Sequence, residues 1–104
     1  MRIISQNGNV DLPYEKALIF HAMETVLARC EGYDKEIVLG EYSSMEKAYK
    51  AMEMLREQHE KVAFLKTIIN TEKGASFVRG LSKNDFDKMT QNYFQFPKDN
   101  EVEV

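Results

Sequence analysis

The fold is decided by residues 36–57, EIVLGEYSSMEKAYKAMEMLRE. In residues 35–42 the apolar side chains fall on both faces of a strand, which is typical of a central strand covered on most of both sides. Ser43 and Glu46 then have the spacing of a capping box, and Ser44 is the alternative N-cap. Helical apolar spacing follows without a gap, so this stretch predicts a strand leading directly into a helix packed on a sheet.

The predicted helix runs from about Met45 to His59 and carries one apolar stripe at steps of three and four residues. Its C-terminal end stays open between two alternatives. The helix either breaks near His59 or continues through residues 62–69, and the turn signal at residues 71–74 stops it in both cases. The stripe comprises Met45, Ala48, Tyr49, Met52, Leu55, His59 and Val62.

Short strand signals dominate the N-terminal part of the chain. Asn7-Gly8 predicts a type I′ hairpin turn after the first strand, and Pro13 places the next extended segment at an edge or a bend. Residues 16–23 read as a strand, with a helix as the rival interpretation. We therefore expect an antiparallel meander. Its segments are Arg2–Ser5, Leu12–Tyr14, Lys16–Met23, Thr25–Cys30 and Lys35–Tyr42.

The C-terminal part completes an α+β fold prediction. Ser82 and Asp85 have the spacing of a second helix start, residues 75–81 are ambiguous, and residues 93–96 read as a last strand ended by Pro97. The expected architecture is a mainly antiparallel four- or five-stranded sheet, built from the N-terminal meander and the C-terminal strand. One main helix packs on it, with one or two further helical segments. Residues 1–97 form the single domain, and residues 98–104 form an acidic, mobile tail.

The predicted core follows from these apolar patterns. At 104 residues, with 43% hydrophobic and 30% charged residues, the chain has the length and composition of one globular domain with an ordinary core. The expected core residues are Ile3, Ile4, Ile19, Phe20, Val26, Leu27, Ile37, Leu39, Met52, Leu55, Leu65, Phe86 and Phe94.

Composition also favours a cytoplasmic location without membrane contact. No apolar run approaches the length of a spanning helix, and the N-terminus turns polar too early for a signal peptide. The single cysteine, Cys30, excludes an internal disulfide framework. Because Cys30 ends an apolar strand, we interpret it as a buried, inert thiol.

Catalytic, metal and cofactor signatures are missing from the sequence. His21 and His59 are the only imidazoles, and neither belongs to a metal-binding spacing such as HExxH. The glycines form no phosphate-binding loop, and Ser43-Ser44 lacks the surroundings of a nucleophile elbow. We therefore predict no catalytic residues, no metal and no cofactor, and a small enzyme is the least favoured function.

Charge is distributed unevenly and gives two candidate binding segments. Residues 61–92 hold six cations against three anions, a net +3, so the rest of a chain that totals −3 carries −6. The cations are interleaved with aromatic residues, namely Phe77, Phe86, Tyr93 and Phe94. This mixture grips phosphate and stacks on bases, although a core with a solvated flank has the same pattern. The basic segment comprises Lys61, Lys66, Lys73, Arg79, Lys83 and Lys88, and the acidic tail offers Asp99, Glu101 and Glu103 to a basic partner.

Three stretches resemble one protein family. The start RIISQNGNVDLPYE, the middle VLGEYSSMEKAYKAMEML and the end FQFPKDNEVEV are similar to short uncharacterised proteins of Firmicutes and of their phages, prophages and other mobile elements. The resemblance covers about half of the chain and departs from the family pattern in residues 58–92. It implies a mobile-element origin, and the family has no known activity or catalytic residues to carry over.

Two functions of different class remain. The first is a non-catalytic protein-binding or regulatory accessory protein that modulates a host or phage complex, including the anti-CRISPR type. The second is a nucleic-acid-binding accessory protein that uses the basic segment. A homodimer joined by a sheet edge or a helix face is compatible with either, because a short meander leaves unpaired edge groups.

Overall fold

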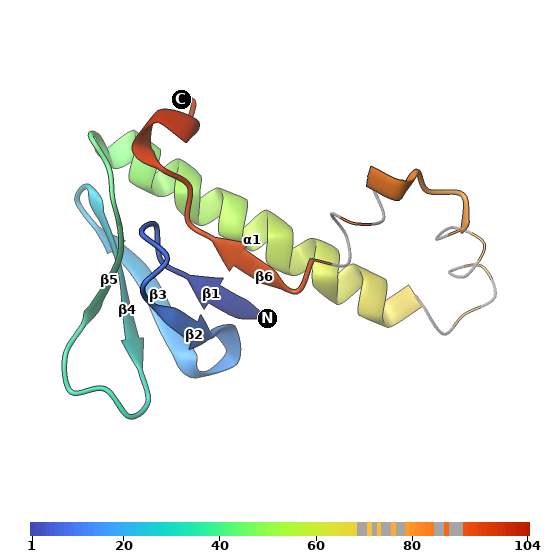
Figure 1. Ribbon diagram of the computed structural model, residues 1–104, viewed down its shortest axis with the longest axis horizontal. Coiled ribbons are helices and arrows are strands. Elements are labelled where there is room, and N and C mark those ends of the chain that lie inside the picture. Colours follow the sequence, from blue (N-terminus) through green and yellow to red (C-terminus); the bar gives the residue numbers. More distant parts are fainter. Residues whose placement is uncertain (69–70, 72, 74–75, 77–78, 85–86, 88–90) are drawn as a thin grey trace.

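The computed structural model describes residues 1–68, 71, 73, 76, 79–84, 87 and 91–104. These residues form an α+β fold, as the sequence predicts (Figure 1). Its elements are β1 (Arg2–Ile4), β2 (Asp11–Pro13), the 3₁₀ helix η1 (Tyr14–Lys16), β3 (Ala17–Ala22), β4 (Thr25–Cys30), β5 (Ile37–Glu41), α1 (Met45–Ile68), β6 (Tyr93–Gln95) and the 3₁₀ helix η2 (Asp99–Glu101).

The strands form two three-stranded sheets, so the prediction of one four- or five-stranded sheet is wrong. One sheet has the order β2-β1-β6 and the other the order β3-β4-β5. The meander divides at Pro13, which has no N–H to donate and is followed by the η1 turn. The C-terminal strand joins the first sheet in parallel, with Phe94 opposite Ile3, while the other pairings are antiparallel.

The predicted type I′ turn at Asn7-Gly8 is also wrong. Gly8 has a φ of +79°, whereas Asn7 is not among the residues with positive φ. The Asn7 side chain instead accepts hydrogen bonds from the Ser5 hydroxyl at 2.7 Å and the Asn9 N–H at 3.0 Å. These local bonds stabilise a wider loop in place of a two-residue hairpin.

The main helix is longer than the expected range ending near His59. It continues to Ile68, which agrees with the second alternative for its end. At its start the Ser44 hydroxyl accepts a hydrogen bond from the Lys47 N–H at 3.2 Å, so Ser44 is the N-cap rather than Ser43. The further helical segments predicted after residue 70 lie largely outside the described residues.

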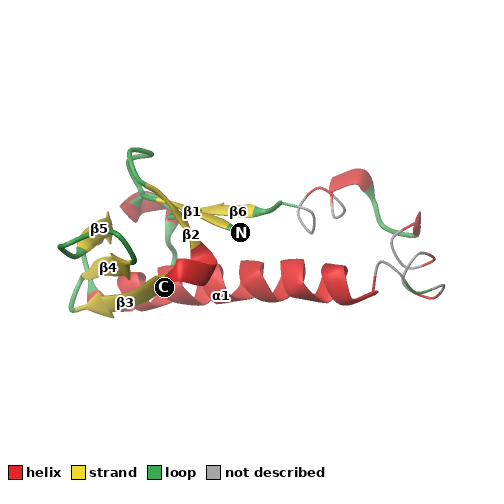
Figure 2. Cartoon of the chain, turned by 90° about the horizontal axis from the view of Figure 1, so that it is seen from below, coloured by secondary structure: helices red, strands yellow, loops and turns green. Residues whose placement is uncertain are grey.

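The core lies where the two sheets and α1 meet. Helix α1 packs against β3 and β4, and the sheet β2-β1-β6 lies along the middle of the same helix (Figure 1). Figure 2 shows that β3 is the strand of its sheet that lies nearest α1. The most deeply buried large side chains are Phe96, Ile3, Leu12, Leu39 and Val26.

Most of the predicted core is confirmed among the described residues. Phe86 lies outside them. Seven predicted residues are buried, namely Ile3, Val26, Leu39, Met52, Leu55, Leu65 and Phe94, and five are half-buried, namely Ile4, Ile19, Phe20, Leu27 and Ile37. Of these five, Phe20 and Leu27 lie on the face of the sheet β3-β4-β5 that points away from α1, because their neighbours along each strand face the core.

Candidate functional site

The outward face of the sheet β3-β4-β5 carries an apolar row. Phe20 pairs with Leu27, and Leu27 pairs with Val38, so these three side chains lie side by side across the three strands. Leu18 extends the row along β3. The exposed fraction is 64% for Leu18 and 48% for Val38. We call Leu18, Phe20, Leu27 and Val38 the outer sheet face.

This face corrects one expectation about residues 35–42. Their apolar side chains on both faces predict a central strand that is covered on most of both sides. The structure places β5 at the end of its sheet, and within the described part of the chain no element packs on Val38 as α1 packs on the inner face. The apolar residues that the sequence places on the second face of this strand therefore belong to the outer sheet face. Sequence reasoning missed the site because it assigned the second face to the core.

The polar boundary of the outer sheet face is nearly neutral. Arg29 lies opposite Leu18 on β4 and donates to Glu36 Oε1 at 2.7 Å. Both side chains of this ion pair are substantially exposed, so the pair contributes little to stability. Contact with this face would therefore be governed by apolar burial more than by charge.

A strained methionine marks the tip of the β3–β4 hairpin. Met23 has a φ of +55°, a conformation that favours glycine or asparagine, and its side chain is 72% exposed. Packing inside the chain does not explain the methionine, because its side chain faces solvent. Because strained backbone conformations cluster at functional sites, Met23 is a candidate contact residue beside the outer sheet face.

A groove runs between β3 and α1. Ile19 and Leu18 of β3 line it from one side, and Met52 and Arg56 of α1 line it from the other, within a volume of about 280 Å³. Toward the start of the helix the apolar stripe stays uncovered, since Met45 is 54% exposed. Part of the helical apolar stripe that the sequence predicts to face the sheet is therefore exposed.

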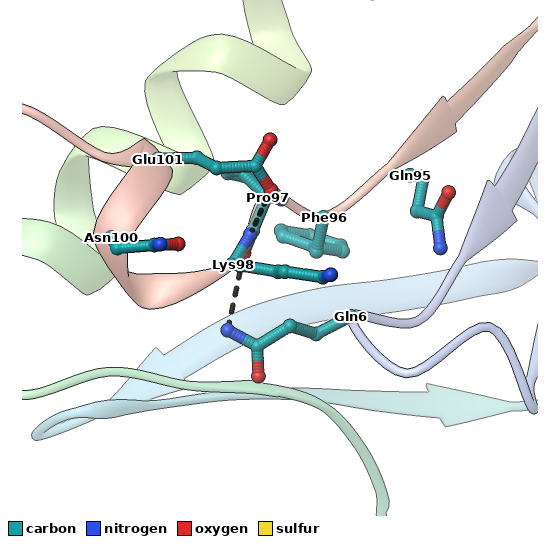
Figure 3. A pocket seen from close by; sticks show the side chains of 7 residues that line it. All are labelled: Gln6, Gln95, Phe96, Pro97, Lys98, Asn100 and Glu101. Atoms are coloured by element: carbon teal, nitrogen blue, oxygen red, sulfur yellow. Dashed lines mark hydrogen bonds between the residues drawn. The ribbon is translucent and has the colours of Figure 1, made fainter.

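A second hollow, of about 560 Å³, lies where the two sheets meet the C-terminal segment (Figure 3). Gln6 crosses it. The Gln6 backbone N–H donates to Leu39 O at 2.7 Å, and its side-chain oxygen accepts from the Glu41 N–H at 3.1 Å. Its side-chain amide donates to Glu41 O at 3.2 Å and to Pro97 O at 3.1 Å. Gln6 therefore acts as a short added strand along the outer edge of β5 and ties both sheets together.

Several polar groups of this hollow bond to other groups of the chain. The Lys98 N–H donates to Glu101 Oε1 at 2.9 Å (Figure 3). The Gln95 amide donates to Ser5 O at 3.3 Å. Ligand sites combine an apolar lining with a few convergent free polar groups. The hollow lacks the apolar lining, because only Phe96 and Pro97 of its lining residues are apolar, and it is better explained as a structural joint.

The candidate acidic tail contacts the start of α1. Asp99 Oδ1 accepts a hydrogen bond from the Ser43 N–H at 2.8 Å, which holds the pKa of the Asp99 carboxyl below its ordinary value, and Lys47 adds to this shift. Glu101 accepts a hydrogen bond from the N–H of Lys98, the residue before η2, and Glu103 is exposed. Because Val102 is only 4% exposed and belongs to the core, the segment has internal partners that the sequence did not reveal. A mobile tail after residue 97 stays a prediction.

Tyr42 connects the same segment to the end of β5. The Tyr42 hydroxyl donates to Pro97 O at 2.8 Å. Burial raises the pKa of the Tyr42 phenol above its ordinary value, and the carboxylates of Asp99 and Glu101 raise it further. The neutral phenol is therefore the form that the folded chain stabilises.

The structure describes five of the six cations of the predicted basic segment. Lys61 lies on α1 in a hollow that also contains Glu57 and the half-exposed ring of Tyr93. Lys66, Lys73, Arg79 and Lys83 are exposed, and Lys88 lies outside the described residues. Phe94, one of the aromatic residues proposed for base stacking, is buried in the core.

The two histidines lie among aromatic rings. His59 stacks on Tyr14 with the ring centroids 4.3 Å apart, and His21 meets the edge of Tyr49 at 6.3 Å. Within the described residues no group of three or more His, Cys, Asp or Glu side chains has a geometry that could hold a metal ion.

Cys30 is buried, as predicted.

Among the described residues no helix is long and apolar enough to span a membrane.

Comparison with known proteins gives no match to a protein-family model, a curated protein or a solved structure. The geometry of the molecule itself therefore carries the functional argument.

Proposed function

We propose that this chain is a non-catalytic protein-binding accessory protein whose partner docks on the outer sheet face. The supporting observation is the apolar row on the outward face of the three strands, in which Val38 is exposed and Phe20 and Leu27 are half-buried. A solvent-facing sheet side in an antiparallel sheet is ordinarily polar, whereas this one is apolar at its centre. The strained, exposed Met23 at the adjoining hairpin tip supports the same interpretation.

We place the protein among the small modulators of host or phage complexes that mobile elements encode, including the anti-CRISPR type. This part of the proposal rests on the sequence resemblance of three stretches of the chain and not on the structure, and no family model matches the chain. The outer sheet face suits such a role because it offers apolar contact without a catalytic group. The partner surface that fits it is an apolar helix side or strand, since the Arg29–Glu36 pair leaves the boundary nearly neutral.

A photo-crosslinking residue at Val38, expressed in the native host, tests the proposal. The matched control carries the same residue at Glu46, which is exposed on α1 outside the outer sheet face. We expect one discrete product from position 38 that position 46 does not give. Identical products from both positions, or none from position 38, would contradict the proposal.

A titration with the purified partner completes this test. Val38→Lys removes apolar contact and forces a charge into the interface, so the Kd should rise at least about tenfold. Glu46→Lys, which also adds positive charge, should leave the Kd within about twofold. Equal effects of the two variants would place the partner elsewhere on the molecule.

Nucleic-acid binding is the second candidate function, and one observation favours it. Lys61 and the half-exposed Tyr93 line the same hollow, which combines a phosphate-binding group with a stacking surface. The test is fluorescence anisotropy with labelled single-stranded DNA at low and moderate salt. Affinity that falls steeply with salt and weakens in Lys61→Ala supports this function, and no binding at low salt removes it.

A further inference from the structure

The two edges of the sheet β3-β4-β5 differ in whether another part of the chain bonds to them. The free edge of β5 is occupied by Gln6, which makes backbone and side-chain hydrogen bonds to Leu39 and Glu41. Within the described chain no strand or loop pairs with the free edge of β3. Exposed edges recruit further strands unless proline, charge, a bulge or a covering element blocks them.

None of these blocking devices is present in β3 itself. The strand has six residues, ALIFHA, without a charge or a proline, and the bulge of this sheet lies between β4 and β5. The two-residue turn after Ala22 makes alternate residues point their backbone groups away from β4, and these include Ile19 and His21. The edge is therefore long, apolar and open.

Apolar surface lies on both sides of this open edge. Leu18 is exposed on the outer side, and on the inner side the groove toward α1 contains Met52 and Arg56 with the half-exposed Tyr49 close by. A strand added to β3 would thus gain backbone hydrogen bonds along its length and apolar contacts on both faces.

We infer that the strand added at this edge is β3 of a second copy of this chain, paired antiparallel about a two-fold axis near Ile19. In that register Ile19 faces the partner's Ile19 on the inner side. Leu18 faces the partner's Phe20 on the outer side, so the cross-strand pairs are apolar. A two-fold axis makes the contact closed, which limits the assembly to a dimer.

Opposite charges at the two ends of β3 favour a second copy of β3 in antiparallel orientation as the added strand. Lys16 precedes β3 and Glu24 follows it, both are exposed, and neither forms an ion pair with another described residue. Antiparallel pairing of two identical strands brings Lys16 of each copy to the end where the partner's Glu24 lies. A parallel pairing would place like charges together at both ends.

The dimer joins the two outer sheet faces into one six-stranded surface. This inference goes beyond the proposed function, because self-association is measured on the isolated protein with no partner present. A failure to dimerise would leave docking on the outer sheet face untouched.

Sedimentation equilibrium of the full chain, up to about 500 µM, tests the inference. We expect a concentration-dependent monomer–dimer equilibrium for the wild type. Leu18→Lys, at a side chain that is 64% exposed in the single chain, should abolish the dimer and leave the fold intact by circular dichroism. The matched control is Tyr93→Lys, an exposed apolar position on the edge strand β6 of the other sheet, and it should keep the dimer.

A charge exchange tests the antiparallel register. Lys16→Glu should raise the dimer dissociation constant about tenfold. The new carboxylate repels Glu24 of the other copy, and the two-fold axis makes this repulsion occur twice in each dimer. The double variant Lys16→Glu with Glu24→Lys should restore it. A wild type that stays monomeric at about 500 µM, a dimer that survives Leu18→Lys, or a double variant as weak as the single one overturns the inference.

Discussion

Replacing Gln6 by alanine tests how the two sheets are held together. The side chain makes hydrogen bonds to the Glu41 N–H, to Glu41 O and to Pro97 O. A typical intramolecular hydrogen bond contributes about 1 kcal/mol net, and these bonds are partly exposed, so water replaces some of them in the variant. We therefore expect Gln6→Ala to lower the free energy of unfolding by roughly 2 kcal/mol.

Chemical denaturation with urea measures this loss directly. The midpoint should fall while the m-value stays unchanged, because the variant buries nearly the same surface on folding. In a thermal scan the same loss corresponds to a decrease of about 10 °C in Tm for a domain of this size. Gln6→Glu should destabilise more strongly than Gln6→Ala, since a carboxylate would face the carbonyl oxygens of Glu41 and Pro97 without a donor.

Gln95→Ala is the matched control. Gln95 lines the same hollow (Figure 3) but makes a single longer bond, at 3.3 Å, to Ser5 O. We expect it to cost less than about 0.5 kcal/mol. Equal losses for Gln6→Ala and Gln95→Ala would refute the assignment of Gln6 as the tie between the sheets.

Three further predictions concern single positions. Met23→Gly should stabilise the fold by about 0.5–1 kcal/mol in urea titrations by relieving the positive φ, whereas Ala22→Gly, inside β3, should destabilise it. Tyr42→Phe should cost about 1 kcal/mol at pH 7. Because the folded-state pKa of Tyr42 is raised, its contribution is complete below its ordinary pKa of about 10 and is lost above it, so the wild type should lose more stability than Tyr42→Phe between pH 9 and 11. Cys30 should react slowly with a thiol reagent under native conditions, and fast stoichiometric labelling would contradict its burial.

Local signals explain the part of the fold that the sequence predicts well. The strand before Ser43 and the helix after it were predictable because alternation, a capping serine and helical spacing act within a few residues of one another. The cap itself was one of two neighbouring serines, and only the hydrogen bond to Lys47 N–H distinguishes Ser44. Helix boundaries of one or two residues lie below the resolution of such patterns.

The division into two sheets depends on a contact between the chain ends. Ile3 pairs with Phe94, and no pattern within either strand specifies a partner about 90 residues away. The docking of Asp99 on the Ser43 N–H is equally non-local, although the free N–H groups at a helix start always require acceptors. The outer sheet face was hidden for a different reason. Apolar alternation looks the same whether the same chain or another chain covers the strand.

Gln6 and β3 together determine whether association is closed or open. With Gln6 in place, the β5 edge is occupied at Leu39 and Glu41, so in the described part of this sheet β3 offers the longer open edge, which permits a two-fold dimer. Gln6→Ala keeps the backbone bond to Leu39 O but removes the side-chain bonds to Glu41, so β3 of one copy can pair with the freed Glu41 end of β5 in the next copy, in a head-to-tail contact that does not close. Light scattering should then show species larger than a dimer for Gln6→Ala, but not for Gln95→Ala. Adding Leu18→Lys to Gln6→Ala should suppress these species, and their persistence would show that β3 is not the strand that pairs.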